Sequence, residues 1–168
     1  MALNDILSQP AVFPALRVGS KKQALQELAA RASEILKRDE REIFETLNQR
    51  ERLGSTGVGH GIAIPHGKLP KMDTLFGMFA RLEKPVDFEA LDGEPVDLVF
   101  LLLAPEAAGA DHLKALRGYA SGTPEGMASW ISHCGQAVGL GFEHRGRKLP
   151  ERCNVHLARA CAEPGVYA

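Results

Sequence analysis

The apolar segment Val96–Leu103 is the feature of this chain that most restricts its fold. It reads VDLVFLLL and is apolar at nearly every position. A strand with one face in water alternates apolar and polar residues, whereas a strand covered on both faces does not need to. The segment is also far too short to span a bilayer. We therefore expect it to form an inner strand of an α/β sheet.

Two amphipathic helices are predicted before this strand. Ser20 and Gln23 have the spacing of a capping box, and the residues that follow are apolar at helical intervals over 21–36. Asp39 is suited to cap a second helix, which runs to about Leu53 and ends at a glycine. Both helices would present one apolar face to the predicted sheet.

Two further strands are predicted at Ile62–Ile64 and Thr74–Leu82, and a third helix at His112 after the N-cap residue Asp111. Helices and strands thus follow one another along the chain. This order predicts an α/β fold with a mixed β-sheet flanked by α-helices.

The segment from Arg50 to Lys68, RERLGSTGVGHGIAIPHGK, combines a glycine-rich loop with a histidine near its end, His66, which lies between a proline and a glycine. Glycines allow backbone N–H groups to approach a ligand closely and to adopt positive φ angles. Successive free N–H groups in such a loop can bind an anion. The expected binding residues of this loop are Gly57, Gly59, His60 and Gly61.

Three side chains are candidates for phosphoryl chemistry: Arg50 at a helix end, His66 after a strand and His112 at a helix start. Neutral imidazole is a nucleophile near neutral pH and can accept a phosphoryl group. Arginine can neutralise phosphate charge with a bidentate contact, and a second histidine can hydrogen-bond the imidazole or the phosphoryl group. From the residues alone, it remains equally open that His66 is a structural histidine and that the glycines only form turns. His60 and His112 would then be surface residues.

The segment LGSTGVGHGIAIPHGK resembles the active-site signature of the mannitol/fructose-type enzyme IIA domains of the bacterial phosphotransferase system. It is most similar to the nitrogen-type regulatory enzyme IIA. The resemblance also includes Pro85–Glu106 and Ala110–Leu116. It implies that His66 accepts the phosphoryl group, that Arg50 faces the phosphohistidine and that His112 is the second active-site histidine.

The resemblance also implies the partners. The donor would be a histidine-phosphocarrier protein of the HPr or NPr type, and the output would be regulation of partner proteins whose identity the sequence does not give. Sugar-transporting members tend to have an acidic residue at the position of His60, which favours the regulatory branch. A sugar-specific enzyme IIA that passes phosphate to a membrane permease and a non-phosphorylated binding module remain alternatives.

The chain departs from the family after Leu116. Residues 117–168 contain eight of the seventeen glycines and have no sustained helical period. We expect an enzyme IIA-type domain over 1–116 and a divergent tail over 117–168, and we favour a frameshift over a genuine appended tail. Loss of the family's C-terminal helices would uncover part of the sheet and promote aggregation.

Charge and composition exclude other classes of function. The net charge of −1 gives no electrostatic reason to bind nucleic acid or an anionic membrane. The cysteines and histidines of the tail do not follow the spacing of a zinc module, so we expect no metal and no cofactor. With no sequence that resembles a signal peptide, a cytoplasmic location is expected.

Overall fold

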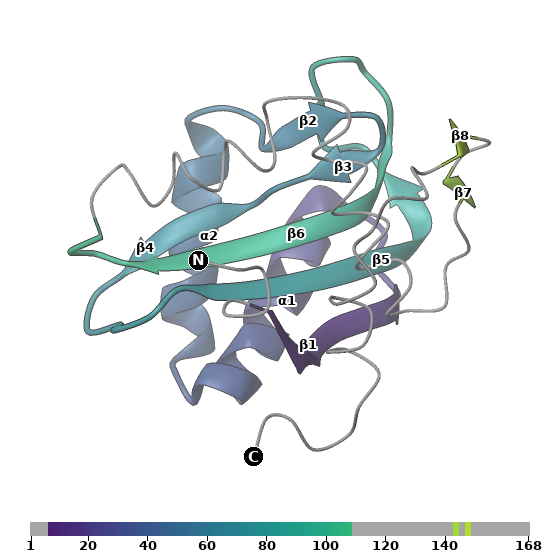
Figure 1. The fold of residues 1–168 in the computed structure, drawn as a ribbon. Coiled ribbons are helices and arrows are strands. Elements are labelled where there is room, and N and C mark those ends of the chain that lie inside the picture. The colour runs from purple at the N-terminus through teal and green to yellow at the C-terminus, as the bar shows by residue number, and fades with distance from the viewer. Residues whose placement is uncertain (1–6, 109–142, 145–146, 149–168) are drawn as a thin grey trace. The chain divides into compact units, whose positions relative to one another are not determined.

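The computed structural model describes residues 7–108, 143–144 and 147–148 (Figure 1). The last two pairs form a short antiparallel pair of strands, β7 (Glu143–His144) and β8 (Arg147–Lys148). The elements of residues 7–107 are, in chain order, β1 (Leu7–Leu16), α1 (Lys21–Leu36), α2 (Glu40–Arg52), β2 (Gly57–Gly59), β3 (Ile62–Ala63), β4 (His66–Leu69), β5 (Phe76–Val86) and β6 (Val96–Pro105).

Strand β6 is the centre of a mixed sheet. The strand order is β1-β5-β6-β3-β2, and β4 also pairs with β6. Strand β5 is antiparallel to β6, whereas β3 and β4 are both parallel to it and β1 is parallel to β5. All residues from Leu98 to Ala104 are buried. The predicted inner strand is therefore confirmed.

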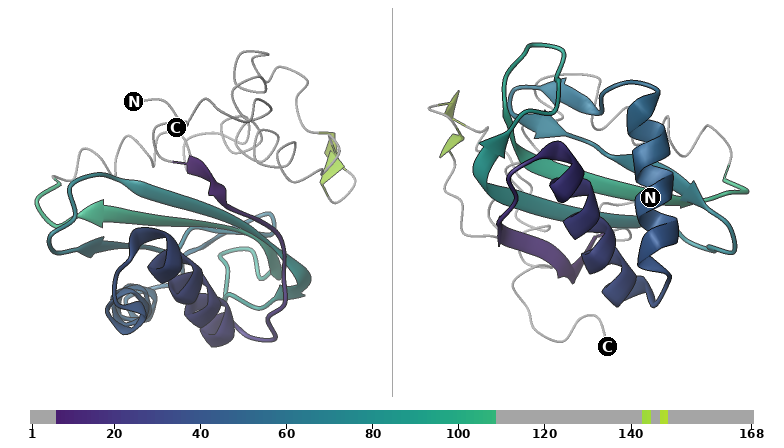
Figure 2. Two further views of the ribbon diagram at one scale, coloured as in Figure 1. Left: turned by 90° about the horizontal axis from the view of Figure 1, so that it is seen from below. Right: turned by 180° about the vertical axis from the view of Figure 1, so that it is seen from behind.

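Helices α1 and α2 lie on the same face of this sheet (Figure 2). The hydroxyl oxygen of Ser20 accepts a hydrogen bond of 3.1 Å from the backbone N–H of Gln23, and the Asp39 carboxylate accepts one of 3.1 Å from the N–H of Glu42. The N-caps predicted for these two helices are thus confirmed. Leu25 and Leu28 of α1 and Ile43 of α2 are buried in the core between the helices and the sheet. The predicted fold class, a mixed sheet flanked by helices, is confirmed.

Several strand boundaries differ from the sequence expectation. The strand expected over 62–64 ends one residue earlier, and the strand expected over 74–82 covers 76–86 instead. The sequence also gave no indication of β1, β2 or β4. The helix expected at His112 lies outside the described residues. Within the part of the chain that the structure describes, neither helix is long and apolar enough to cross a membrane.

Candidate functional site

His66 lies at the start of β4, which follows β3 along the same neighbouring strand, β6. Ile62 pairs with Leu98 of β6, and His66 pairs with Leu102. Between β3 and β4, the N–H of Ile64 turns away from β6 and donates a hydrogen bond of 2.9 Å to the carbonyl of Thr56. His66 is therefore the first residue of a second strand and not, as expected, the residue after a single one. The pairing keeps the same register across this interval, and the N–H of Leu102 donates a hydrogen bond of 2.9 Å to the carbonyl of Pro65, so β4 continues the alignment of β3 along β6.

Both nitrogens of the half-buried His66 imidazole have hydrogen-bond partners. Nδ1 lies 2.9 Å from the carbonyl oxygen of Ile64, and Nε2 lies 2.9 Å from Nε of Arg50. A carbonyl only accepts and a guanidinium only donates, so the network assigns the proton to Nδ1 and the lone pair to Nε2. The ring is thus the neutral tautomer whose nucleophilic nitrogen is Nε2.

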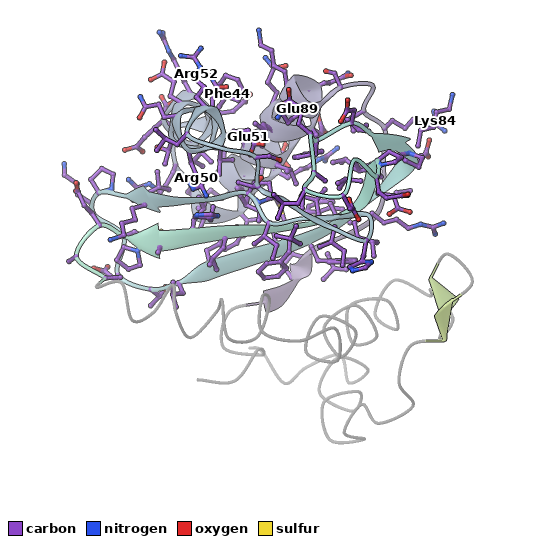
Figure 3. All side chains as sticks on the ribbon, turned by 90° about the horizontal axis from the view of Figure 1, so that it is seen from above. Phe44, Arg50, Glu51, Arg52, Lys84 and Glu89 are labelled. Atoms are coloured by element: carbon purple, nitrogen blue, oxygen red, sulfur yellow. The ribbon has the colours of Figure 1, made fainter. Side chains whose placement is uncertain are left out.

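Arg50 reaches His66 from the last turn of α2. In Figure 3 its side chain lies between α2 and the strands, whereas Arg52 lies on the far side of the helix. Besides the contact with Nε2, the Nη1 group of Arg50 donates a hydrogen bond of 3.0 Å to the carbonyl of Gly54. The guanidinium therefore folds back over the start of the glycine loop, as the sequence led us to expect. It places a fixed positive charge beside the nucleophilic nitrogen.

Gly67 allows α2 to come this close to β4. A Cβ atom at residue 67 would lie 2.5 Å from Cγ2 of Thr46, a residue one turn of α2 before Arg50. Real Cβ atoms essentially never make such a contact, so any side chain here would force the helix or the strand to move. The glycine after His66 is thus part of the geometry that joins Arg50 to the imidazole.

The tip of the glycine loop lies away from the imidazole. Gly57 and Gly59 belong to β2, and His60 and Gly61 form the turn to β3. The Gly61 carbonyl accepts hydrogen bonds from the N–H groups of residues 97 and 98, four to five residues before the partner of His66 on β6. At ~3.3 Å per residue this is a separation of at least about 13 Å along the strand. The structure therefore brings Arg50 to His66 but not the tip of the loop.

Asp92 holds the tip of this loop. His60 has a φ of 55°, and its N–H donates a hydrogen bond of 2.8 Å to Oδ2 of Asp92. The hydrogen bonds from the N–H groups of His60 and Glu94 lower the pKa of Asp92 below its usual range. A carboxylate of the protein itself thus accepts the hydrogen bond that this N–H could have offered to an external anion.

The lowered pKa of Asp92 predicts an acid-sensitive loop tip. A carboxyl group with a depressed folded pKa stabilises the fold above its unfolded pKa and loses that contribution as the pH falls through the folded value. We expect the amide proton signal of His60 to titrate with a midpoint below 3.8, the ordinary value for aspartate. NMR titration of the folded protein measures this midpoint, and Asp92→Asn should abolish the transition. A midpoint above the ordinary value would contradict the assignment.

The carboxylate of Glu51 is an important group that sequence reasoning missed. It is buried and accepts hydrogen bonds from the N–H of Thr56 at 3.1 Å and from its hydroxyl at 2.5 Å. It also forms an ion pair of 3.1 Å with Nζ of Lys21. The signal was its spacing: Glu51 follows Ile43 and Leu47 at intervals of four, on the buried stripe of α2. A charged residue on such a stripe needs a buried partner.

His112 lies outside the described residues, as do the cysteines and histidines considered for a metal site. Its expected place beside His66 stays a prediction, and so does the boundary between 1–116 and 117–168. Of the predicted site residues, the structure describes His66, Arg50 and the loop residues Gly57, Gly59, His60 and Gly61, and it joins Arg50 to the imidazole through a close approach at Gly67, which was not predicted. Together His66 and Arg50 form a nucleophilic nitrogen with a cation beside it, at the start of a strand in a mixed α/β sheet.

Comparison with known proteins identifies the class to which this fold and site belong. The model of the family "phosphoenolpyruvate-dependent sugar phosphotransferase system, EIIA 2" matches residues 5–119, and the chain belongs to this family. A nitrogen regulatory protein of Bradyrhizobium diazoefficiens is 66% identical over 116 residues, which cover 69% of this chain and 76% of that protein. A nitrogen regulatory protein of Pseudomonas aeruginosa is 51% identical over 104 residues, covering 61% and 68%. The resemblance to the nitrogen-type branch is thereby confirmed.

Solved structures agree with this assignment. The crystal structure of nitrogen regulatory protein IIA-Ntr from Neisseria meningitidis matches with a TM-score of 0.64 at 41% identity, covering 68% of this chain and 79% of that one. The crystal structure of IIA mannitol from Escherichia coli matches with a TM-score of 0.55 at 15% identity, covering 93% and 99%. At that identity the second likeness shows the fold alone. The match to the family model ends three residues after Leu116, where the sequence patterns change.

Proposed function

We propose that this protein accepts a phosphoryl group on Nε2 of His66 and regulates partner proteins through its phosphorylation state. The observation that carries the proposal is the tautomer of His66: Nδ1 bonds to a carbonyl, so the lone pair is on Nε2, 2.9 Å from Arg50. Family membership implies a phosphocarrier partner. The donor we propose is a histidine-phosphocarrier protein of the HPr or NPr type.

The transfer exchanges one phosphorus–nitrogen bond for another. The Nε2 lone pair of His66 attacks the phosphorus of the donor's phosphohistidine, and the electron pair of the breaking bond returns to the donor's imidazole nitrogen. Positive charge develops on the His66 ring, and the Ile64 carbonyl, which accepts a hydrogen bond from the Nδ1–H group, stabilises it. Arg50 neutralises charge on the phosphoryl oxygens, and phosphoryl transfer depends mainly on such positioning and charge compensation. His112 would add a hydrogen bond to the imidazole or the phosphoryl group.

The regulatory role is favoured over sugar transport by the similarity to known proteins. The nitrogen regulatory protein of B. diazoefficiens is 66% identical to this chain, whereas a fructose-specific EIIABC component of Bacillus subtilis is 33% identical over 117 residues. The loop tip around Gly59, His60 and Gly61 would then contact a partner protein and not the phosphoryl group, because it lies along β6 from the imidazole. The cytoplasmic location expected from the sequence suits both roles.

A phosphorylation assay tests the proposal. The protein is incubated with phosphoenolpyruvate, enzyme I and a phosphocarrier protein, and intact mass is measured before and after acid treatment. We expect an acid-labile gain of one phosphoryl group that His66→Ala abolishes. A wild-type protein that gains no mass would favour the non-phosphorylated binding module. Onward transfer to a sugar permease domain would favour the sugar-specific enzyme IIA.

A further inference from the structure

Glu51 is a buried carboxylate that takes no direct part in the proposed phosphoryl transfer. Its side chain is only 5% exposed. It also lies in the last turn of α2, where the partial negative charge of the helix end disfavours an anion. A carboxylate in such a place is retained only if its partners compensate for burial. The partners of Glu51 are Lys21 and Thr56.

Lys21 provides a permanent cation for this carboxylate. Its ammonium lies 3.1 Å from Oε1 of Glu51 and 2.5 Å from Oε2 of Glu89. Burial lowers the pKa of Lys21, but the hydrogen bonds to Glu89 and Glu51 raise it by more, so the pKa is above its ordinary value. In Figure 3, Glu51 and Glu89 lie on the same side of α2. Glu51 is thus held between α1 and the segment that follows β5.

Thr56, the second partner of Glu51, is connected to the His66 imidazole through Ile64. The carbonyl of Thr56 accepts the N–H of Ile64 at 2.9 Å, and the carbonyl of Ile64 accepts the Nδ1 proton of His66 at 2.9 Å. Hydrogen bonds, joined through the backbones of Thr56 and Ile64, therefore connect the Glu51 carboxylate with the ring nitrogen that carries the proton.

The Glu51 carboxylate is also linked to Arg50, the partner of Nε2 on the other side of the ring. Arg50, the neighbour of Glu51, bonds both to Nε2 of His66 and to the carbonyl of Gly54. Gly54 lies in the short segment that the bond between Glu51 and Thr56 closes. If this segment loosens, the carbonyl that orients the guanidinium moves with it.

We infer that Glu51 is a positioning residue that fixes both hydrogen-bond partners of the His66 imidazole. By holding Thr56 it places the Ile64 carbonyl that keeps the proton on Nδ1 and the Gly54 carbonyl that orients Arg50. Nε2 is thereby kept unprotonated and oriented toward Arg50. The effect on phosphoryl transfer depends on the proposed function, whereas the effect on the tautomer of His66 does not.

The tautomer of His66 is the decisive measurement. In Glu51→Gln, the side chain keeps its size but loses its charge and sets an amide N–H against the donors of Lys21 and Thr56. We expect the Nε2-protonated form of His66, absent from the wild type, to become detectable in 15N NMR spectra of protein labelled at histidine. The matched control is Glu45→Gln, an exposed glutamate of the same helix that pairs with Arg41. Its spectrum should be that of the wild type.

The rate of phosphorylation is the second measurement. A misplaced imidazole should slow Glu51→Gln by about 10- to 100-fold, and Glu45→Gln should react at the wild-type rate. If Glu51→Gln does not fold, Thr56→Val and Thr56→Ser replace it: valine removes the hydroxyl that Glu51 binds, and serine keeps it. Valine should then shift the tautomer and serine should not.

The results separate positioning from a merely structural role. A lower melting temperature with an unchanged tautomer, measured well below unfolding, would overturn the inference. If the wild type accepts no phosphoryl group, the proposed function fails, but the tautomer of the variants still decides whether Glu51 positions the ring.

Discussion

Replacement of Arg50 by alanine should slow the phosphorylation of His66 by about 10-fold, because the loss of a preorganised donor for developing charge outweighs an opposing gain by about 1 kcal/mol. Two effects oppose each other in this variant. Loss of the hydrogen bond to Nε2 frees the nucleophilic lone pair. This lowers the activation free energy by at most about 1.5–3 kcal/mol, the contribution of a hydrogen bond from a charged donor. Loss of the cation removes stabilisation of the phosphoryl oxygens, about 2.7–4 kcal/mol. The second effect should dominate.

Quench-flow or mass-spectrometric kinetics with the phosphorylated carrier protein would measure this loss. The matched control is Arg52→Ala, which removes the same charge from the same helix end but from the exposed far side of α2 (Figure 3). It should react within a few-fold of the wild type. Equal losses in the two variants would mean that Arg50 acts only through long-range charge. Arg50→Lys should fall between wild type and Arg50→Ala because it keeps the charge but loses the guanidinium fork.

Replacement of Gly67 by alanine should both destabilise the fold and separate Arg50 from His66. The new Cβ would lie 2.5 Å from Cγ2 of Thr46, so α2 and β4 must move apart. Overpacking of this kind costs about 1–3 kcal/mol of unfolding free energy. A shift of the helix by about 1 Å would lengthen the bond between Arg50 and Nε2 and slow phosphorylation by up to about 100-fold. Chemical denaturation and phosphorylation kinetics measure the two effects.

A second substitution makes this prediction specific. Thr46→Ser removes the Cγ2 methyl group but keeps a hydroxyl to bond the carbonyl of Glu42. The next atom of residue 46 would be 3.6 Å from the new Cβ, an ordinary contact. The double variant Gly67→Ala/Thr46→Ser should therefore recover most of the lost stability and rate. Gly19→Ala is the matched control, because its Cβ meets only Gln23 at 3.4 Å. No recovery in the double variant would refute the steric explanation.

Local signals in the sequence were sufficient to predict the helices and the two residues at the centre of the site. Both helices could be predicted from the caps at Ser20 and Asp39 and from the spacing of apolar residues, because these effects act within a few residues. The position of Arg50 in the last turn of α2 followed from the same pattern. The resemblance of the glycine-rich segment to a family signature then singled out His66, one of its two histidines, as the predicted phosphoryl acceptor.

Other features depend on contacts between distant segments, and the sequence did not reveal them. Strand β1 contains Pro10 and Pro14, which argue against a strand unless it lies at the edge of a sheet, as β1 does. The loop tip at His60 is distant from the imidazole because β3, which follows the tip, pairs with an earlier part of β6 than β4, which begins with His66. Glu51 meets Lys21 across thirty residues of chain, and no local pattern predicts such a pair.

The hydrogen bond between Arg50 and Nε2 of His66 also bears on the equilibrium of phosphoryl exchange. This bond stabilises the unphosphorylated protein. The contacts of Arg50 with phosphate therefore favour phosphorylation only by the amount of free energy by which they exceed this bond. In the proposed mechanism Arg50 contacts His66 before phosphorylation and the phosphoryl group after it, which makes the free energies of the two states more nearly equal. A carrier with nearly equal end states passes its group on as readily as it receives it. If His66 is the phosphoryl acceptor that we propose, the bond at 2.9 Å helps to set the group-transfer potential of the site as well as its rate.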